Sequence, residues 1–302
     1  MTWDALARRG ARGGVRAGIA LYLVAVLLFA AMDVCTKLLV AHLPVLQVTW
    51  ARFTVHTLVM GAALPLAGQR LRLWPRAPRL QVLRSFALAG SNLFTAAAVA
   101  HAPLATVTAI NFTAPLLTVG LAAAWLREAV GRRRWAAVAV GLGGVVIVLR
   151  PGVSGLPPAA FLALGSAAVY AVYQLLTRRL AGVDTSPTTI LQTGLWPAIV
   201  TSVLVPLVWT PPVRSEWLLL GLVGVLGGVS HFLLVLAFER APASLLAPLS
   251  YSQMIWASLS GLALFGERLD GYTATGAVVI AADGLLAFAS GKPPPTAGEQ
   301  RG

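Results

Sequence analysis

The chain has 302 residues, of which 58% are hydrophobic and only 11% are charged, far below the charged share of about 25% in an ordinary soluble domain. This composition excludes a water-soluble globular protein and indicates a chain that folds in lipid. The formal net charge is +13, but the basic residues cluster in short breaks between apolar stretches. Orientation in a membrane explains such clusters, and we therefore expect no nucleic-acid partner.

Apolar stretches long enough to cross a bilayer follow one another along the whole chain. A bilayer core about 30 Å thick requires roughly 20 apolar residues in helical conformation. The pattern predicts ten spanning helices, in chain order at residues 17–39, 44–66, 80–101, 104–126, 133–150, 158–177, 187–209, 216–238, 243–265 and 271–289. The expected fold class is an all-α membrane protein. Its single cysteine, Cys35, lies in the first helix and leaves no partner for an internal disulfide.

The basic residues predict the orientation. Eighteen of the 23 Lys and Arg residues, Arg84 among them, fall on the side of the membrane where residues 1–16 lie, and three fall on the other side. Because short cytoplasmic loops carry the excess of Lys and Arg, we expect both termini in the cytoplasm. Residues 291–302 are polar and rich in proline, with Pro293, Pro294 and Pro295, and we expect them to form a disordered cytoplasmic tail.

The ten helices form two copies of a five-helix unit. A shift of 139 residues superposes Ala102-Pro103 on Ala241-Pro242, and the predicted repeats are residues 17–150, helices 1 to 5, and residues 158–290, helices 6 to 10. Because five is an odd number, the second copy enters the bilayer in the opposite sense. Many secondary transporters are built from such inverted repeats, with the substrate bound between the copies near the bilayer midplane.

The repeated segments resemble a known family. The stretch Ala102-Pro103-Leu104-Ala105-Thr106 leads to Leu126-Arg127-Glu128, and Ala241-Pro242 leads to Leu264-Phe265-Gly266-Glu267-Arg268-Leu269. These segments are similar to the tandem repeats of the EamA branch of the drug/metabolite transporter superfamily, although the first copy has Arg127 where the family usually has Gly. The resemblance implies two EamA repeats of five helices and a carrier for a small organic metabolite in a bacterial inner membrane.

Two further segments resemble one branch of that superfamily. Met32-Asp33-Val34-Cys35-Thr36-Lys37 and Ala247-Pro248-Leu249-Ser250-Tyr251 are similar to segments of S-adenosylmethionine uptake carriers and riboflavin carriers. The resemblance implies uptake of one of these compounds, while export of amino acids or drugs remains the alternative within the superfamily.

Four ionisable residues stand out at membrane depth in the predicted helices, namely Asp33, Lys37, Arg52 and Asp283. A charge at the bilayer centre costs about 2.5 to 3.5 kcal/mol on insertion scales, so each is a candidate for function. Asp33 and Arg52 lie at similar depth on either side of the first break, which predicts an ion pair. In a structural interpretation this pair joins helices 1 and 2 while Lys37 reaches the surface. In a functional one Arg52 or Lys37 meets an anionic substrate group, and Asp33, Lys37 and Asp283 serve gating or proton coupling.

Helices 4 and 9 are related by the repeat and carry polar and proline residues near their middles, where irregular backbone can face a substrate. Asn92 superposes on His231 at the same shift of 139 residues. A histidine or an aromatic ring in an apolar helix also serves packing alone, and that alternative stays open. The candidate substrate-binding residues are Asn111, Ser250, Tyr251, Gln253, Asn92, His231, Arg52 and His56.

These features favour a secondary transporter that works by alternating access. The glycine clusters lack the strand-to-helix context of a nucleotide site, so we expect neither ATP-driven transport nor a cofactor. No cluster of acids, nucleophiles or metal ligands suits the alternative, a membrane-embedded enzyme, and no metal is expected. The expected partners are a small-molecule substrate and the lipid bilayer, and a homodimer stays open.

Overall fold

The computed structural model describes residues 3–66, 73–125, 132–149, 157–180, 183–241 and 243–289. The described residues are helical almost throughout and contain no β-strand, which confirms the all-α prediction. In chain order the elements are α1 Trp3–Val40, α2 Val45–Leu66, α3 Pro78–Val99, α4 Leu104–Asn111, α5 Ala114–Trp125, α6 Arg132–Leu149, α7 Pro158–Leu180, α8 Ser186–Leu204, η1 Val205–Val208, α9 Arg214–Arg240, α10 Ala243–Leu246, η2 Ala247–Tyr251, α11 Ser252–Phe265 and α12 Gly271–Ala289.

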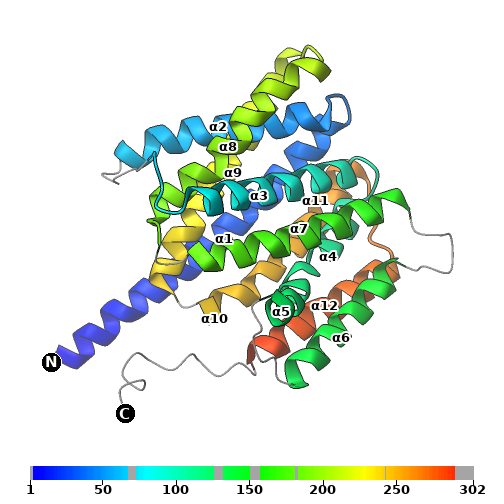
Figure 1. The fold of residues 1–302 in the computed structure, drawn as a ribbon. Helices are drawn as coiled ribbons and strands as arrows, with labels where there is room; N and C mark the ends of the chain where they lie inside the picture. Colours follow the sequence, from blue (N-terminus) through cyan, green and yellow to red (C-terminus); the bar gives the residue numbers. More distant parts are fainter. Residues whose placement is uncertain are drawn as a thin grey trace.

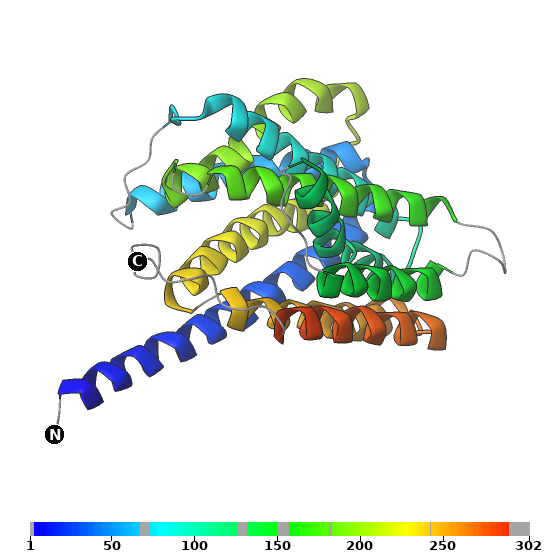
Figure 2. The ribbon, with the colours of Figure 1, turned by 60° about the horizontal axis from the view of Figure 1, so that its bottom comes forward.

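These elements gather into one bundle of helices (Figures 1 and 2). Each of the ten predicted spans corresponds to one helix or to a broken helix, and six described stretches are long and apolar enough to cross a membrane by length and composition. One boundary differs from the prediction, because α1 begins at Trp3 rather than near residue 17. Its first turns project from the bundle in both views. The predicted disordered tail at 291–302 lies outside the described residues.

The fourth and ninth spans are broken helices rather than continuous ones. α4 ends at Asn111 and α5 begins at Ala114, one residue before Pro115. In the ninth span, α10 passes into the 3₁₀ turn η2, which contains Pro248, before α11 begins. Proline cannot donate the backbone hydrogen bond to the residue four positions earlier and clashes with its carbonyl group. Proline therefore accounts for both breaks. They lie in the repeat-related pair of spans, next to the predicted site residues.

The two repeats contact each other in a reciprocal way at the two ends of the bundle. We call the end where α1 finishes, at Val40, the far end, and the end where α1 starts the near end. At the far end the Gln47 side chain donates to the Thr210 carbonyl at 2.9 Å and accepts from its N–H at 3.0 Å. At the near end Gln192 Nε2 donates to the Leu73 carbonyl at 2.7 Å. Each repeat thus uses a glutamine to hold a loop of the other, at opposite ends of the bundle.

Glycines allow the closest helix contacts. A β-carbon on Gly224 of α9 would lie 2.3 Å from Val55 Cβ on α2, and one on Gly276 of α12 would lie 2.5 Å from the Gly144 carbonyl oxygen on α6. Real side chains do not approach so closely, so these helices pack at this distance only because the residues are glycines. Figures 1 and 2 show α6 and α12 side by side.

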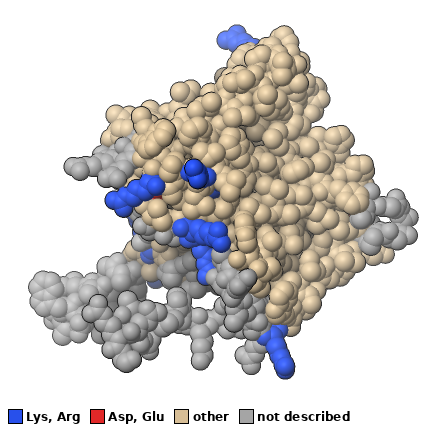
Figure 3. Space-filling model, viewed as in Figure 1, with Lys and Arg blue, Asp and Glu red and all other residues tan. Residues whose placement is uncertain are grey.

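The surface agrees with a lipid environment. Figure 3 shows that on one face Lys and Arg gather on the left and at the top and bottom, whereas the broad area to the right of them carries no charged residue. Large apolar side chains are exposed on many helices, for example Leu58, Phe161 and Leu218, at 67%, 59% and 74%. Water-soluble proteins rarely expose apolar surface on this scale, so the bundle is a multi-pass membrane protein.

Asp184 ties two loops together at the near end. It lies between α7 and α8, and its carboxylate accepts hydrogen bonds from the Arg76 backbone N–H at 2.7 Å and from Gln81 Nε2 at 3.1 Å. Burial raises the pKa of Asp184, but these hydrogen bonds outweigh it, and the pKa lies below its ordinary value.

Candidate substrate site

A hydrogen bond between Asp33 and Gln253 joins the two repeats near the middle of the bundle. Gln253 Nε2 on α11 donates to Asp33 Oδ2 on α1 at 3.1 Å. Both side chains remain partly exposed. The structure therefore brings together one residue predicted to bind substrate and one predicted to serve gating or coupling, from spans 1 and 9.

Arg52 extends from α2 toward α9 and α1. Its guanidinium lies over the Phe53 ring, 5.6 Å from the centroid, and its Nε lies 3.7 Å from the position that a β-carbon on Gly227 would take. The charges of Arg52 and Asp33 attract each other, yet no nitrogen of Arg52 lies within 4.0 Å of an Asp33 oxygen. The predicted ion pair is therefore not formed, and the two opposite charges are neighbours without direct contact.

Two histidines from opposite repeats lie close enough to Arg52 to interact with it electrostatically. The rings of His56 on α2 and His231 on α9 are 5.8 Å apart at 80°. His56 Nε2 lies 3.2 Å from the Ile190 carbonyl, and His231 Nδ1 lies 2.8 Å from the Gly227 carbonyl. A ring nitrogen facing a carbonyl oxygen must carry the proton, which assigns the tautomer of each neutral ring. Both histidines thus have a structural hydrogen bond and also border the predicted site.

Tyr170 of α7 is partly exposed although it lies on the inner side of its helix. The Tyr170 side chain is 38% exposed. It follows the outward-facing Phe161 by nine residues, about two and a half turns, and so lies on the opposite side of α7. On the same inner face, two turns closer to the far end, Ala163 is completely buried. The inner face of α7 is therefore packed shut toward the far end and uncovered at the level of Tyr170. The Tyr173 ring lies 5.2 Å from that of Tyr170.

The broken spans contribute the remaining predicted residues. Asn111, at the end of α4, donates to Thr95 Oγ1 at 3.2 Å, while its Oδ1 is buried without a hydrogen-bond partner. The Tyr251 ring stacks on Phe112 with centroids 4.9 Å apart, so the two breaks touch. Ser250 is hydrogen-bonded to Tyr22 of α1.

Asn92 is used locally, since its Nδ2 donates to the Leu88 carbonyl one turn earlier in α3 at 2.9 Å. The structure therefore gives Asn92 a bond within its own helix, whereas its repeat counterpart His231 contacts the Phe29 ring and interacts electrostatically with Arg52.

Arg84 is a buried cation that the sequence analysis assigned to the membrane surface. Only 4% of it is exposed, and its guanidinium donates to Thr177 Oγ1, Thr193 Oγ1 and the Tyr173 hydroxyl at 2.7, 2.7 and 2.9 Å. The guanidinium also lies 4.7 Å from the Tyr173 ring centroid. All these partners belong to α7 and α8 of the second repeat, and none can be recognised from the sequence around Arg84.

Lys37 forms an ion pair and a hydrogen bond at the far end. Its Nζ forms an ion pair with Glu267 and donates to the Ala102 carbonyl at 2.8 Å. Glu267 also accepts from the Leu104 backbone N–H at 3.0 Å. Gly266 ends α11 in the left-handed conformation, with φ of 65°, which glycine adopts without strain. The typical Gly-Glu sequence therefore turns the chain so that Glu267 faces α1 and α4.

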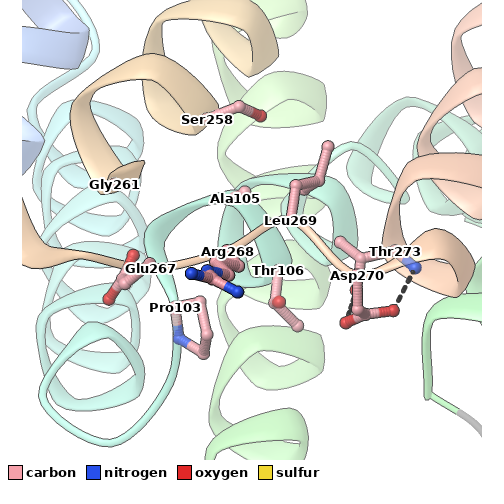
Figure 4. Close-up of a pocket in the computed structure, with 10 residues that line it drawn as sticks. All are labelled: Pro103, Ala105, Thr106, Ser258, Gly261, Glu267, Arg268, Leu269, Asp270 and Thr273. Atoms are coloured by element: carbon pink, nitrogen blue, oxygen red, sulfur yellow. Dashed lines mark hydrogen bonds between the residues drawn. The ribbon is translucent and has the colours of Figure 1, made fainter. Parts of the chain in front are cut away.

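We call this contact, made by Lys37, Glu267, Ala102 and Leu104, the far-end latch. A small pocket lies beside it, lined by residues that include Pro103, Ser258 and Arg268 (Figure 4). The latch joins α1 and the start of α4, in the first repeat, to the segment between α11 and α12 in the second. The prediction that Lys37 reaches the surface needs correction, because the Lys37 side chain is only 14% exposed and is paired.

Asp283 of α12 lies apart from these groups. It is 4% exposed, and its Oδ2 is buried without a hydrogen-bond partner. A β-carbon on Gly141 of α6 would lie 2.9 Å from that oxygen. A buried carboxyl group without a partner is costly to ionise, which keeps Asp283 a candidate for binding a proton.

Comparisons with known proteins agree with this architecture. The profile of the EamA-like transporter family matches residues 16–150 and 157–287. The chain is 27% identical to an S-adenosylmethionine uptake transporter of Rickettsia bellii, over 87% of this chain and 90% of that protein. It is 28% identical to a riboflavin transporter of Vibrio cholerae, over 79% and 80% of the two chains. A solved crystal structure superposes with a TM-score of 0.66 at 24% identity and covers 90% of this chain and 97% of its own, which shows a shared fold.

Proposed function

The chain belongs to the EamA-like transporter family, and we propose that it moves its substrate by alternating access between its two repeats. It is a membrane transporter for a small metabolite, not an enzyme. The observation that carries this proposal is the hydrogen bond between Gln253 and Asp33 at 3.1 Å, which crosses from one repeat to the other near mid-depth. In inverted-repeat transporters the substrate site lies at this position, and rocking of the repeats exposes it to each side in turn.

The far-end latch acts as the gate on one side in this proposal. Ala163 is completely buried toward the far end, whereas Tyr170 is 38% exposed, and this difference supports a conformation closed at the far end. Opening that end separates α1 and α4 from the segment after α11, and therefore breaks the ion pair between Lys37 and Glu267. The near end then closes around the loops that Asp184 and Gln192 hold.

The distribution of the basic residues supports an orientation in the membrane. The near-end loops carry most of the Lys and Arg, and such loops face the cytoplasm. We place the chain in a bacterial inner membrane with both termini in the cytoplasm, so that the far-end latch faces the outside of the cell. Cysteine labelling of one near-end and one far-end loop tests this, and labelling of both from the same side contradicts it.

Asp283 is the proposed proton-coupling residue. Its Oδ2 is buried without a partner, and Tyr251 of the broken ninth span lies close enough to interact with it electrostatically. A movement of η2 during transport would change the surroundings of the carboxyl group and so its affinity for a proton. Asp33 and the two histidines, which already have hydrogen-bond partners, are weaker candidates.

The relatives supply two substrates to test first, S-adenosylmethionine and riboflavin. Uptake of each into liposomes that contain the purified protein should saturate with concentration if the chain is a carrier. Gln253→Ala should reduce uptake by about tenfold, since it removes a hydrogen bond to a charged group worth about 1.5 kcal/mol. Ser258→Ala, on the same helix, is the matched control. Flux that rises linearly with concentration, or equal flux in empty liposomes, would rule out the carrier.

A further inference from the structure

We propose that Asp33 and Arg52 together bind the head group of an α-amino acid, with the ammonium group at Asp33 and the carboxylate at Arg52. This inference rests on the proposed transport function and names the class of its substrate. S-adenosylmethionine, for which the Rickettsia bellii relative is named, contains such a head group, whereas riboflavin contains none.

The charges themselves give the first argument. Each lies inside a bundle where an unpaired charge costs several kcal/mol, and the two attract each other from neighbouring helices. If their role were only to hold α1 and α2 together, direct contact would give the strongest attraction, because attraction increases as distance and dielectric constant fall. Instead no Arg52 nitrogen lies within 4.0 Å of Asp33. The separation suits a molecule that carries both opposite charges.

The hydrogen-bonding capacity of the two residues gives the second argument. A carboxylate accepts about four hydrogen bonds and a guanidinium donates five. Among the described residues, Asp33 has one side-chain hydrogen-bond partner, Gln253, and the Arg52 guanidinium contacts the Phe53 ring but makes no hydrogen bond. Both side chains are partly exposed. Acceptors and donors are therefore available on adjacent helices for an ammonium group and a carboxylate.

Net charge excludes the simpler ligands. An anion bound at Arg52 would leave the Asp33 carboxylate beside a second negative charge, and a cation bound at Asp33 would leave Arg52 beside a second positive charge. A zwitterion satisfies both residues and keeps the cluster neutral, which minimises the cost of the charges inside the membrane. The ring of Tyr170, which is 38% exposed and interacts electrostatically with Arg52, offers a flat surface for the remainder of the substrate.

The test measures binding to the purified full-length protein by ligand-induced thermal stabilisation. The probes are S-adenosylmethionine, the standard amino acids and riboflavin. For the amino acid compound that binds most tightly, two analogues follow, the amine that lacks the carboxylate and the acid that lacks the ammonium group. We expect each analogue to bind about 10- to 100-fold more weakly, the effect of one hydrogen-bonded charge. This comparison needs no variant, so a failure of folding cannot obscure it.

Two variants then assign each charge to its residue. Arg52→Gln should make the amino acid and the amine bind equally, and Asp33→Asn should make the amino acid and the acid bind equally. Arg268→Gln, an exposed site at the far end, is the control and should preserve the full discrimination. The proposal is overturned if no α-amino acid binds, if the analogues bind as tightly as the parent compound, or if riboflavin alone binds.

The same measurements separate this inference from the proposed function. If liposomes take up a metabolite but binding ignores the head group, the carrier stands and the inference fails. If the head group is recognised but liposomes show no saturable uptake, the inference stands and the proposed transport mechanism fails.

Discussion

Removing either charge of the far-end latch should open the far end. The side chains of Lys37 and Glu267 are 14% and 16% exposed, so the pair lies between a surface ion pair, worth up to about 1 kcal/mol, and a buried pair, whose disruption costs about 3 to 5 kcal/mol. Because the hydrogen bonds to Ala102 and Leu104 partly compensate the remaining charge, we expect a loss of about 2 kcal/mol. That loss shifts the ratio of closed to open molecules by about 30-fold.

The assay is the labelling rate of a cysteine placed beside the latch. Ser258→Cys in a Cys35→Ser background gives one cysteine next to the latch, since Cys35 is the only natural one. A charged thiol reagent that does not cross membranes is added to intact cells. Lys37→Met and Glu267→Gln should each accelerate labelling by about tenfold or more, and exchange of the two charges should restore much of the original rate.

The control is Arg268→Gln, which removes a charge from the residue next to Glu267 but leaves the latch intact. Rates within twofold of the parent protein in both latch variants, with unchanged melting temperatures, would refute the assignment of the latch as a gate.

Three further predictions concern coupling, packing and pH. Asp283→Asn should abolish the stimulation of uptake by a proton gradient, measured in liposomes, whereas Asp184→Asn should leave it unchanged; stimulation in both variants would exclude Asp283. Gly224→Val should destabilise the protein by about 1 to 3 kcal/mol, because the valine side chain would clash with Val55 where α9 packs against α2. The measurement is a lower melting temperature. Gly221→Val should have little effect, because no neighbouring atom lies within 4 Å of a β-carbon there. The pKa of Asp184 is lowered from its ordinary 3.8, so its ionised form stabilises the fold above about pH 4, and this contribution is lost as the pH falls further. Between about pH 5 and pH 3 the melting temperature of the parent protein should therefore fall more than that of Asp184→Asn. Parallel curves of melting temperature against pH would contradict the stabilising role of its hydrogen bonds.

Much of the fold could be predicted from the sequence because lipid allows few solutions. A spanning segment must satisfy its backbone hydrogen bonds internally. Each apolar stretch long enough to cross the bilayer could therefore be predicted as a helix. The breaks at Pro115 and Pro248 were recognisable as weak points, but a proline in a membrane helix produces either a kink or a break, and packing decides which. The sequence therefore located the breaks without predicting that two separate helices form.

The sequence could name candidate site residues but not their contacts. Asp33, Arg52 and Asp283 were recognisable because charges are rare at membrane depth. The partner of Lys37, Glu267, lies 230 positions away in the sequence, and the similarity of Glu267 to Glu128 gave no sign of which side chain it would meet. Arg84 was missed because it follows an arginine-rich loop by only a few residues, where a long side chain normally bends toward the surface.

The surroundings of Arg84 have a consequence for how the protein is made. The cation of α3 receives its hydrogen bonds from Thr177, Tyr173 and Thr193, residues that the ribosome adds about 90 to 110 positions later. Until then α3 carries a cation without these partners, which opposes its insertion by at most about 2.5 to 3.5 kcal/mol, the cost of a charge at a helix centre. A nascent chain stopped after the first repeat should therefore hold α3 poorly in the bilayer, and biogenesis becomes complete only when α7 and α8 emerge from the translocon.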